Sequence, residues 1–219
     1  ERFRFVGRER GYHGMNIGCI SVGGMINNVK TFASVLMPGV QHMRHTHLPE
    51  HKFVSGQPET GGDLANDLER IATNFGPENI AACIVEPIAG STGTLVPPIG
   101  YLQKLRKICD KHGILLIFDE VITGWGRTGS SFAAHEFGVT PDIMTMAKAT
   151  TNGVVPMGVV ACKDEIYDAV MDASPMGSVE LFHGYTYSGI PVAVAAALAV
   201  QDIFEKEDIF NRAKNLAPY

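Results

Sequence analysis

The strongest constraint on the fold of this chain is an apolar run that ends in two carboxylates. The run covers residues 114–118 and is followed directly by Asp119 and Glu120. A continuous apolar segment of this length is typical of a strand that is buried on both faces, as in a parallel sheet. In an open α/β sheet, the carboxyl ends of such strands line the ligand crevice. We therefore expect a buried strand whose tip carries a functional acid.

A second apolar run, residues 143–146, leads into a single lysine, Lys148. A lysine after a buried strand is usually a surface residue, but residues 149–153 are small and polar and suit the wall of a tight cavity. A desolvated lysine amine forms Schiff bases with carbonyl groups. A carboxylate such as Asp119 can keep a heterocyclic nitrogen protonated. This acid and amine together fit pyridoxal phosphate, whose ring acts as an electron sink.

Strand and helix signals alternate along the rest of the chain. Strands are expected at residues 2–7, 80–85, 114–119, 143–146 and 158–162, and helices at residues 63–75, 100–112, 132–137, 164–171, 191–204 and 208–216. Residues 27–60 have little periodicity and are expected to form a long ordered loop. The alternation predicts an α/β domain with a mostly parallel sheet and helices on both faces.

Composition and charge narrow the classes of function. The net charge of −5 and the lack of a basic cluster argue against a nucleic-acid partner. The longest apolar run, residues 192–200, is too short to span a bilayer. The four cysteines are far apart in the sequence, as expected for free thiols in the cytoplasm. Four histidines between residues 42 and 51 have no cysteine at ligand spacing, so no metal site is expected.

The acidic strand tip also fits a different class of enzyme. An apolar strand ending in Asp-Glu resembles a Walker B strand, in which Asp119 would hold Mg²⁺ and Glu120 would activate water. Such an enzyme needs a Gly-x-x-x-x-Gly-Lys-Ser/Thr loop, which these 219 residues do not contain. An ATPase therefore remains a distant alternative, as does an inactive fragment that only associates with partner chains.

Five motifs, taken in order, resemble those of the class III aminotransferases. They are Tyr12-His13-Gly14, Glu86-Pro87, Phe118-Asp119-Glu120-Val121 with the glycine-rich loop 124–129, Ala147-Lys148-Ala149, and Thr186-Tyr187-Ser188-Gly189. Residues 89–93, 96–98 and 181–185 are most similar to the ω-amino acid (β-alanine):pyruvate transaminases. The resemblance implies a pyridoxal-phosphate enzyme of fold type I, in which residues 1–219 form a partial cofactor-binding large domain with a mostly parallel sheet flanked by helices.

The same resemblance implies roles at the ring of the cofactor. Lys148 would form the Schiff base and then move the proton, while Asp119 would pair with the pyridine nitrogen. Val121 and Tyr12 would pack on the two faces of the ring. Tyr12 is equally well interpreted as an ordinary turn residue. His13 would support Asp119, although a purely structural histidine is the simpler interpretation of that residue alone.

Further roles concern the surroundings of the ring. Glu86 would organise the polar groups near the cofactor. Tyr185 and Thr186 would reach the cofactor phosphate of a neighbouring subunit, which implies a homodimer or tetramer with shared active sites. An alternative assigns residues 186–188 to the N-cap region of the helix that starts near Pro191.

The implied activity is transamination of an ω-amino acid or amine with pyruvate as acceptor. Within class III, γ-aminobutyrate, ornithine and diamine transaminases and semialdehyde aminomutases are alternatives. The chain departs from the family in lacking the upstream phosphate-binding helix start and the C-terminal small domain. We therefore expect an internal fragment that binds the cofactor weakly, or not at all, by itself. Two smaller departures are Ile190, where histidine is usual, and Trp125, where phenylalanine is common.

Overall fold

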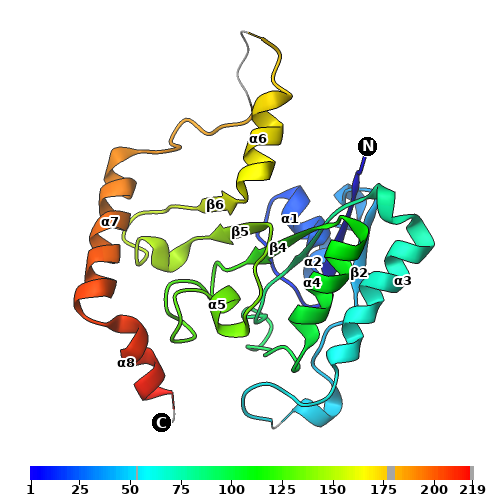
Figure 1. Cartoon of the computed structure of the whole chain (residues 1–219), viewed down its shortest axis with the longest axis horizontal. Helices are drawn as coiled ribbons and strands as arrows, with labels where there is room; N and C mark the ends of the chain where they lie inside the picture. The colour runs from blue at the N-terminus through cyan, green and yellow to red at the C-terminus, as the bar shows by residue number, and fades with distance from the viewer. Residues whose placement is uncertain (53, 177–180, 218–219) are drawn as a thin grey trace.

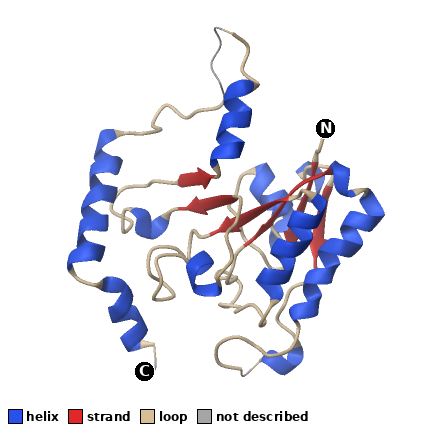
Figure 2. Ribbon diagram, viewed as in Figure 1, coloured by secondary structure: helices blue, strands red, loops and turns tan. Residues whose placement is uncertain are grey.

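A six-stranded sheet forms the centre of the structure, a computed structural model that describes residues 1–52, 54–176 and 181–217 (Figures 1 and 2). In space the strands follow the order β2-β1-β3-β4-β5-β6. The first five are parallel, and β6 runs antiparallel to β5. Their bounds are β1 Arg4–Arg8, β2 Val40–Met43, β3 Ile80–Val85, β4 Leu115–Asp119, β5 Ile143–Met146 and β6 Val159–Cys162.

Helices connect the first five strands, and further helices follow β6. Their bounds are α1 Ile17–Val22, α2 Ile26–Thr31, α3 Asn66–Phe75, α4 Tyr101–His112, α5 Ala133–Phe137, α6 Asp164–Asp172, α7 Pro191–Lys206 and α8 Ile209–Leu216. In α4, Leu102, Leu105 and Ile108 recur at helical spacing and are all buried against the sheet. Gly113 ends this helix in a left-handed conformation, φ 62°, and its N–H bonds the last carbonyl groups.

Helices pack against both faces of the sheet, as β1 shows. Val6 points into the core that contains Leu68 of α3 and Leu105 of α4. Gly7 faces the other way, because neighbouring side chains of a strand point to opposite faces. Here α1 comes so close that a Cβ on Gly7 would overlap the carbonyl oxygen of Val22. The expected α/β layering is therefore confirmed.

Asp142 joins several elements beside the core. Its carboxylate accepts hydrogen bonds from Arg106 of α4 at 2.7 Å and from the N–H of Leu116 in β4 at 2.7 Å. It also pairs with Lys163, just before α6, at 2.7 Å. Burial raises the pKa of Asp142, but these partners together hold it below its usual value.

Two expectations about the elements were wrong. Residues 27–60 do not form only a loop, because β2 lies within them and pairs in parallel with β1, Phe5 opposite Val40. Four residues are too short for a visible alternation, so the pairing with β1 creates this strand. The expected helix at residues 63–75 begins as a 3₁₀ turn, Gly62–Ala65, before α3.

The last two helices lie at the opposite side of the molecule from α3 (Figure 1). Several large apolar side chains of α7 are exposed, among them Val192, Leu198 and Ile203. A helix with this much exposed apolar surface is typical of an element that another surface covers. None of the helices in the described ranges has the length and apolar character needed to cross a bilayer.

Candidate active site

Five of the predicted site residues, Tyr12, His13, Glu86, Asp119 and Lys148, lie along one edge of the sheet. Strands β1, β3, β4 and β5 are parallel, so their carboxyl ends lie along the same edge. Tyr12 and His13 follow β1, Glu86 follows β3, Asp119 ends β4 and Lys148 follows β5. The chain passes from β1 outward to β2 and returns to β3 on the other side of β1. Such a switch in strand order is where open α/β sheets bind ligands.

Asp119 is fixed in place by two neighbours. One oxygen of its carboxylate, Oδ2, lies 2.8 Å from Nδ1 of His13. The other oxygen, Oδ1, accepts a hydrogen bond from the N–H of Val121 at 3.1 Å. Asp119 is only 7% exposed, and Nε2 of His13 is buried without a hydrogen-bond partner in the described part of the chain. Nδ1 therefore donates to the carboxylate, because an ionised carboxylate is only an acceptor.

Glu86 connects the two loops that meet at the switch point. Its carboxylate accepts hydrogen bonds from the N–H of Tyr12 and from the N–H of Gly90, each at 2.9 Å. Arg8, at the end of β1, donates to the carbonyl oxygen of Glu86 at 2.7 Å. Glu86 is 4% exposed. It therefore acts as a brace that positions Tyr12, which is more specific than the general polar role expected from the sequence.

Arg8, which donates to the Glu86 carbonyl, was not predicted from the sequence as a site residue. The side chain is buried, and its guanidinium carbon lies 5.7 Å from the centre of the Tyr101 ring. A buried cation is costly unless it is hydrogen-bonded, so Arg8 must be held by groups such as the Glu86 carbonyl. No clear sequence signal marks Arg8, because the same strand also begins with an arginine, Arg4.

Lys148 begins a short 3₁₀ turn, Lys148–Thr150, in a left-handed conformation with φ 45°. The turn is closed by the N–H of Thr150, which bonds the carbonyl of Ala147 at 3.0 Å. The Lys148 side chain is exposed, and its amine has no hydrogen bond or ion pair within residues 1–52, 54–176 and 181–217. This corrects the expectation of a desolvated lysine. Thr150 and Thr151 are buried behind the turn and do not enclose the amine.

Three more predicted residues occupy different settings. Val121 is partly buried and is held beside Asp119 by its own N–H. Tyr185 and Thr186 are exposed, Tyr185 by 72%, in a turn before α7. Their side chains have no hydrogen bond to Asp119 or Lys148 in the described part of the chain. Thr186 is not the N-cap of α7, because that position is Ile190 and has no side-chain cap.

Glu120 has a structural setting that contradicts its role in the ATPase alternative. The side chain is fully buried and accepts hydrogen bonds from the hydroxyl of Thr123 at 2.6 Å and from the N–H groups of Ala133 and Ala134 at 2.9 and 2.7 Å. The N–H groups of Ala133 and Ala134 lie at the start of α5, where a carboxylate satisfies free N–H groups. Glu120 is therefore occupied in holding α5 and is not available to activate water.

Cys19, His42 and His51 also carry reactive groups, and each has a structural setting that explains its state. Burial raises the pKa of the Cys19 thiol, and the charge of Asp119 adds to this effect. The thiol therefore stays neutral and is a poor nucleophile. His42 bonds the carbonyl of Gly23 at 2.8 Å, and His51 bonds the hydroxyl of Thr60 at 3.0 Å. Among the residues described, no group of three histidine, cysteine or acidic side chains is placed to hold a metal ion.

The family model "Aminotransferase class-III" matches residues 1–219. An omega-aminotransferase of Caulobacter vibrioides is 58% identical over 99% of this chain and 49% of its own length. A beta-alanine–pyruvate aminotransferase of Pseudomonas aeruginosa is 50% identical over 100% of this chain and 49% of its own length. This chain thus spans about half the length of the curated relatives that it matches.

Solved structures show the same fold. A thermostable (S)-enantioselective omega-transaminase from Thermomicrobium roseum superposes with a TM-score of 0.86 and 39% identity, over 95% of this chain and 46% of that one. A transaminase solved with L-ala gives a TM-score of 0.87 and 36% identity, over 95% of this chain and 49% of that one. The mostly parallel sheet flanked by helices is therefore the architecture of these neighbours.

Proposed function

Because this chain belongs to the class III aminotransferases, which depend on pyridoxal phosphate, we propose that the complete protein transfers an amino group from an ω-amino acid or amine to pyruvate. The observation that carries the proposal is the pairing of Asp119 with His13 at the same sheet edge as the unpaired amine of Lys148. The names of the relatives at 58% and 50% identity support the substrate class.

The residues at the edge fit pyridoxal phosphate. Each oxygen of the Asp119 carboxylate has one partner, which leaves acceptor capacity for a protonated ring nitrogen. The amine of Lys148 has no partner in the described residues, so it is available to bond the aldehyde carbon. When bound, the cofactor supplies a protonated ring that withdraws electrons from the substrate carbon.

The residues of this chain then have distinct tasks. Asp119 keeps the proton on the ring nitrogen, and His13 donates to Asp119 so that the carboxylate stays oriented. Val121 and Tyr12 would pack against the ring of the bound cofactor. Lys148 would hold the cofactor through Nζ, and once the substrate amine had displaced it, Nζ would accept the proton from the substrate carbon and deliver it to the cofactor carbon.

The proposal extends to the assembly. Residues 1–219 would be a partial large domain, which fits their coverage of about half of each relative. Tyr185 and Thr186 would contact the cofactor phosphate of a neighbouring subunit in a homodimer or tetramer, and their exposure supports this role. A cytoplasmic location is part of the same proposal, supported by four cysteines that are all free thiols.

The two half-reactions test this function separately. The complete protein is loaded with pyridoxal phosphate and mixed with β-alanine alone, which should remove the visible absorption band of the lysine-bound cofactor. Pyruvate should then restore the band. Lys148→Ala should show neither change, whereas Lys107→Ala, which alters an exposed lysine of α4, should cycle normally. A band that ignores β-alanine but responds to γ-aminobutyrate, ornithine or a diamine would replace the proposed donor.

A further inference from the structure

A single side-chain hydrogen bond links the loop after Asp119 to the turn that carries Lys148. Trp125, in the glycine-rich loop after β4, donates from its indole Nε1 to the hydroxyl oxygen of Thr150 at 2.9 Å. Thr150 is the last residue of the Lys148–Thr150 turn. Strands β4 and β5 are neighbours in the sheet, so this bond adds a second connection beyond their tips.

The hydroxyl of Thr150 is fully used in this arrangement. It donates its only hydrogen to the carbonyl oxygen of Ala147 at 3.0 Å, which leaves its lone pairs directed at the indole. Thr150 is buried, so no solvent replaces a lost partner easily. The two hydrogen bonds therefore brace the turn just where Lys148 has its left-handed backbone conformation, φ 45°, which is unfavourable for a residue with a side chain.

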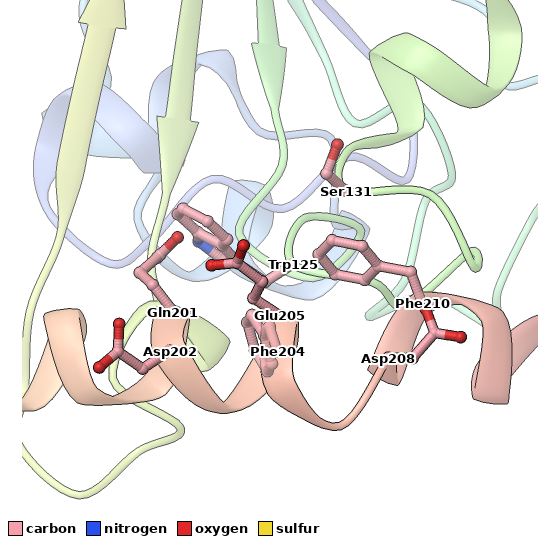
Figure 3. Close-up of a pocket in the computed structure, with 8 residues that line it drawn as sticks. All are labelled: Trp125, Ser131, Gln201, Asp202, Phe204, Glu205, Asp208 and Phe210. Atoms are coloured by element: carbon pink, nitrogen blue, oxygen red, sulfur yellow. The ribbon is translucent and has the colours of Figure 1, made fainter.

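Trp125 is itself held firmly. Its ring packs edge-on against Phe132, with 5.0 Å between the ring centres, and lies 6.3 Å from the ring of Phe204 in α7. The backbone N–H of Trp125 donates to the carbonyl of Ser131 at 2.6 Å. Trp125, Phe204 and Phe210 line a cavity of about 470 Å³. Figure 3 shows the indole next to Phe204, with Phe210 farther to the right. The donor thus comes from a side chain that is already fixed by packing.

We infer that Trp125 is a positioning residue, which holds the Lys148 turn through Thr150 in the orientation needed for attachment of the cofactor. Phenylalanine at this position would keep the ring contacts but has no N–H to donate. The inference rests on the proposed function, because it assigns Trp125 a task only if Lys148 bonds pyridoxal phosphate. The proposed role depends on the indole N–H of Trp125, which only tryptophan can supply at this position.

The test measures how fast the cofactor-free complete protein bonds pyridoxal phosphate, a step that joins Nζ of Lys148 to the aldehyde carbon and releases one water molecule. Growth of the visible band in a stopped-flow instrument gives the rate. Trp125→Phe should slow it about fivefold, the usual worth of one hydrogen bond. Thr150→Val should slow it at least as much, and the double variant should be no slower than Thr150→Val, because both remove the same link.

Two controls separate positioning from general stability. Thr150→Ser keeps the hydroxyl and should restore the wild-type rate. Ile71→Val removes one buried methyl group from α3 and leaves the Trp125–Thr150 hydrogen bond and its packing intact, so it should lower the melting temperature with an unchanged attachment rate. A Trp125→Phe rate within the error of wild type, or effects that multiply in the double variant, would overturn the inference.

A further variant, Lys148→Ala, shows whether a negative result refutes only the role of Trp125 or also the proposed function. Lys148→Ala should abolish attachment. If it does, and Trp125→Phe still behaves as wild type, only the role of Trp125 is wrong. If pyridoxal phosphate still bonds the Lys148→Ala protein, another lysine carries the cofactor, and both the proposed function and this inference are overturned.

Discussion

His13 and Val121 direct the Asp119 carboxylate before any ligand is bound. Nδ1 of His13 and the N–H of Val121 each contact a different carboxylate oxygen, so rotation of the group is restricted. A preorganised charge does not have to reorient when the reaction needs it. The Asp119 carboxylate therefore lies at the strand tip in a fixed orientation. A partner for a ring nitrogen needs such an orientation.

Asp119→Asn should lower kcat of the complete protein by about 10²- to 10³-fold, because the amide has the same shape but lacks the charge that keeps a proton on the ring. Binding of the cofactor should fall much less, since Lys148 still bonds it. Steady-state rates and a cofactor titration measure the two effects. The matched control is Asp110→Asn, which removes an exposed carboxylate of α4. Full activity in Asp119→Asn would show that the acid does not face the ring.

Glu120→Gln should destabilise the protein by about 1–3 kcal/mol, because the amide brings a donor against the N–H groups of Ala133 and Ala134. Urea unfolding measures the change. Glu136→Gln alters an exposed carboxylate that also accepts one hydrogen bond, from Ser130, and should stay within about 0.5 kcal/mol. A stable Glu120→Gln protein would refute the buried cap of α5.

The sequence predicted which residues gather at the site but not how they are held. Asp119 and Lys148 follow apolar runs, and parallel strands bring such tips to one edge. The hydrogen bonds of Glu86 to Tyr12 and Gly90 could not be predicted, because both partners lie on loops whose paths depend on the whole sheet. The exposure of Lys148 was also unpredictable, since small residues pack equally well behind a turn or around it.

At the scale of elements, the longer segments were predictable and the short one was not. Helix α4 has a complete apolar stripe and a glycine at its end, and both of its bounds agree with the sequence to within one residue. Strand β2 has four residues, of which only Met43 is buried, so no local pattern marks it. It exists because the edge of β1 offers free backbone groups for pairing.

Asp142→Asn should lower the free energy of unfolding by about 1–3 kcal/mol at neutral pH, because it removes the charge that Arg106 and Lys163 share. The pKa of Asp142 is lowered in the folded state, so its contribution is complete above the ordinary aspartate pKa of about 3.9. It is lost as the pH falls through the lower, folded value.

Unfolding curves between neutral and strongly acidic pH measure this effect. The difference between wild type and Asp142→Asn should shrink as the solution becomes more acidic than about pH 4. Asp110→Asn removes the other, exposed partner of Arg106 and should cost less than about 1 kcal/mol. A difference that stays constant with pH would show that the charge of Asp142 is not the source of its stabilisation.

At the scale of the whole molecule, large apolar side chains and predicted site residues are exposed in and before α7. Phe182, Tyr185 and Tyr187 are strongly exposed in the turn before α7, as are several side chains of α7. Exposed apolar surface of this extent is typical of a contact with another domain or subunit. It agrees with a chain that spans about half the length of its relatives.

Mixing two inactive variants tests whether subunits share active sites. Lys148→Ala lacks the lysine, and Thr186→Glu would repel the phosphate of the neighbouring subunit. In a mixed dimer, one site has both defects and the other has none, so refolding equal amounts together should recover up to about a quarter of the wild-type activity. No recovery, with mixed dimers present on a native gel, would mean that Thr186 serves the site of its own chain.

Chemical trapping identifies the lysine that bonds the cofactor. The complete protein is incubated with pyridoxal phosphate, reduced with borohydride and digested, and mass spectrometry locates the modified lysine. We expect the reduced cofactor on Lys148, and we expect excess β-alanine added before reduction to remove the label. A label on another lysine, or none on Lys148 in protein that has bound the cofactor, would contradict it.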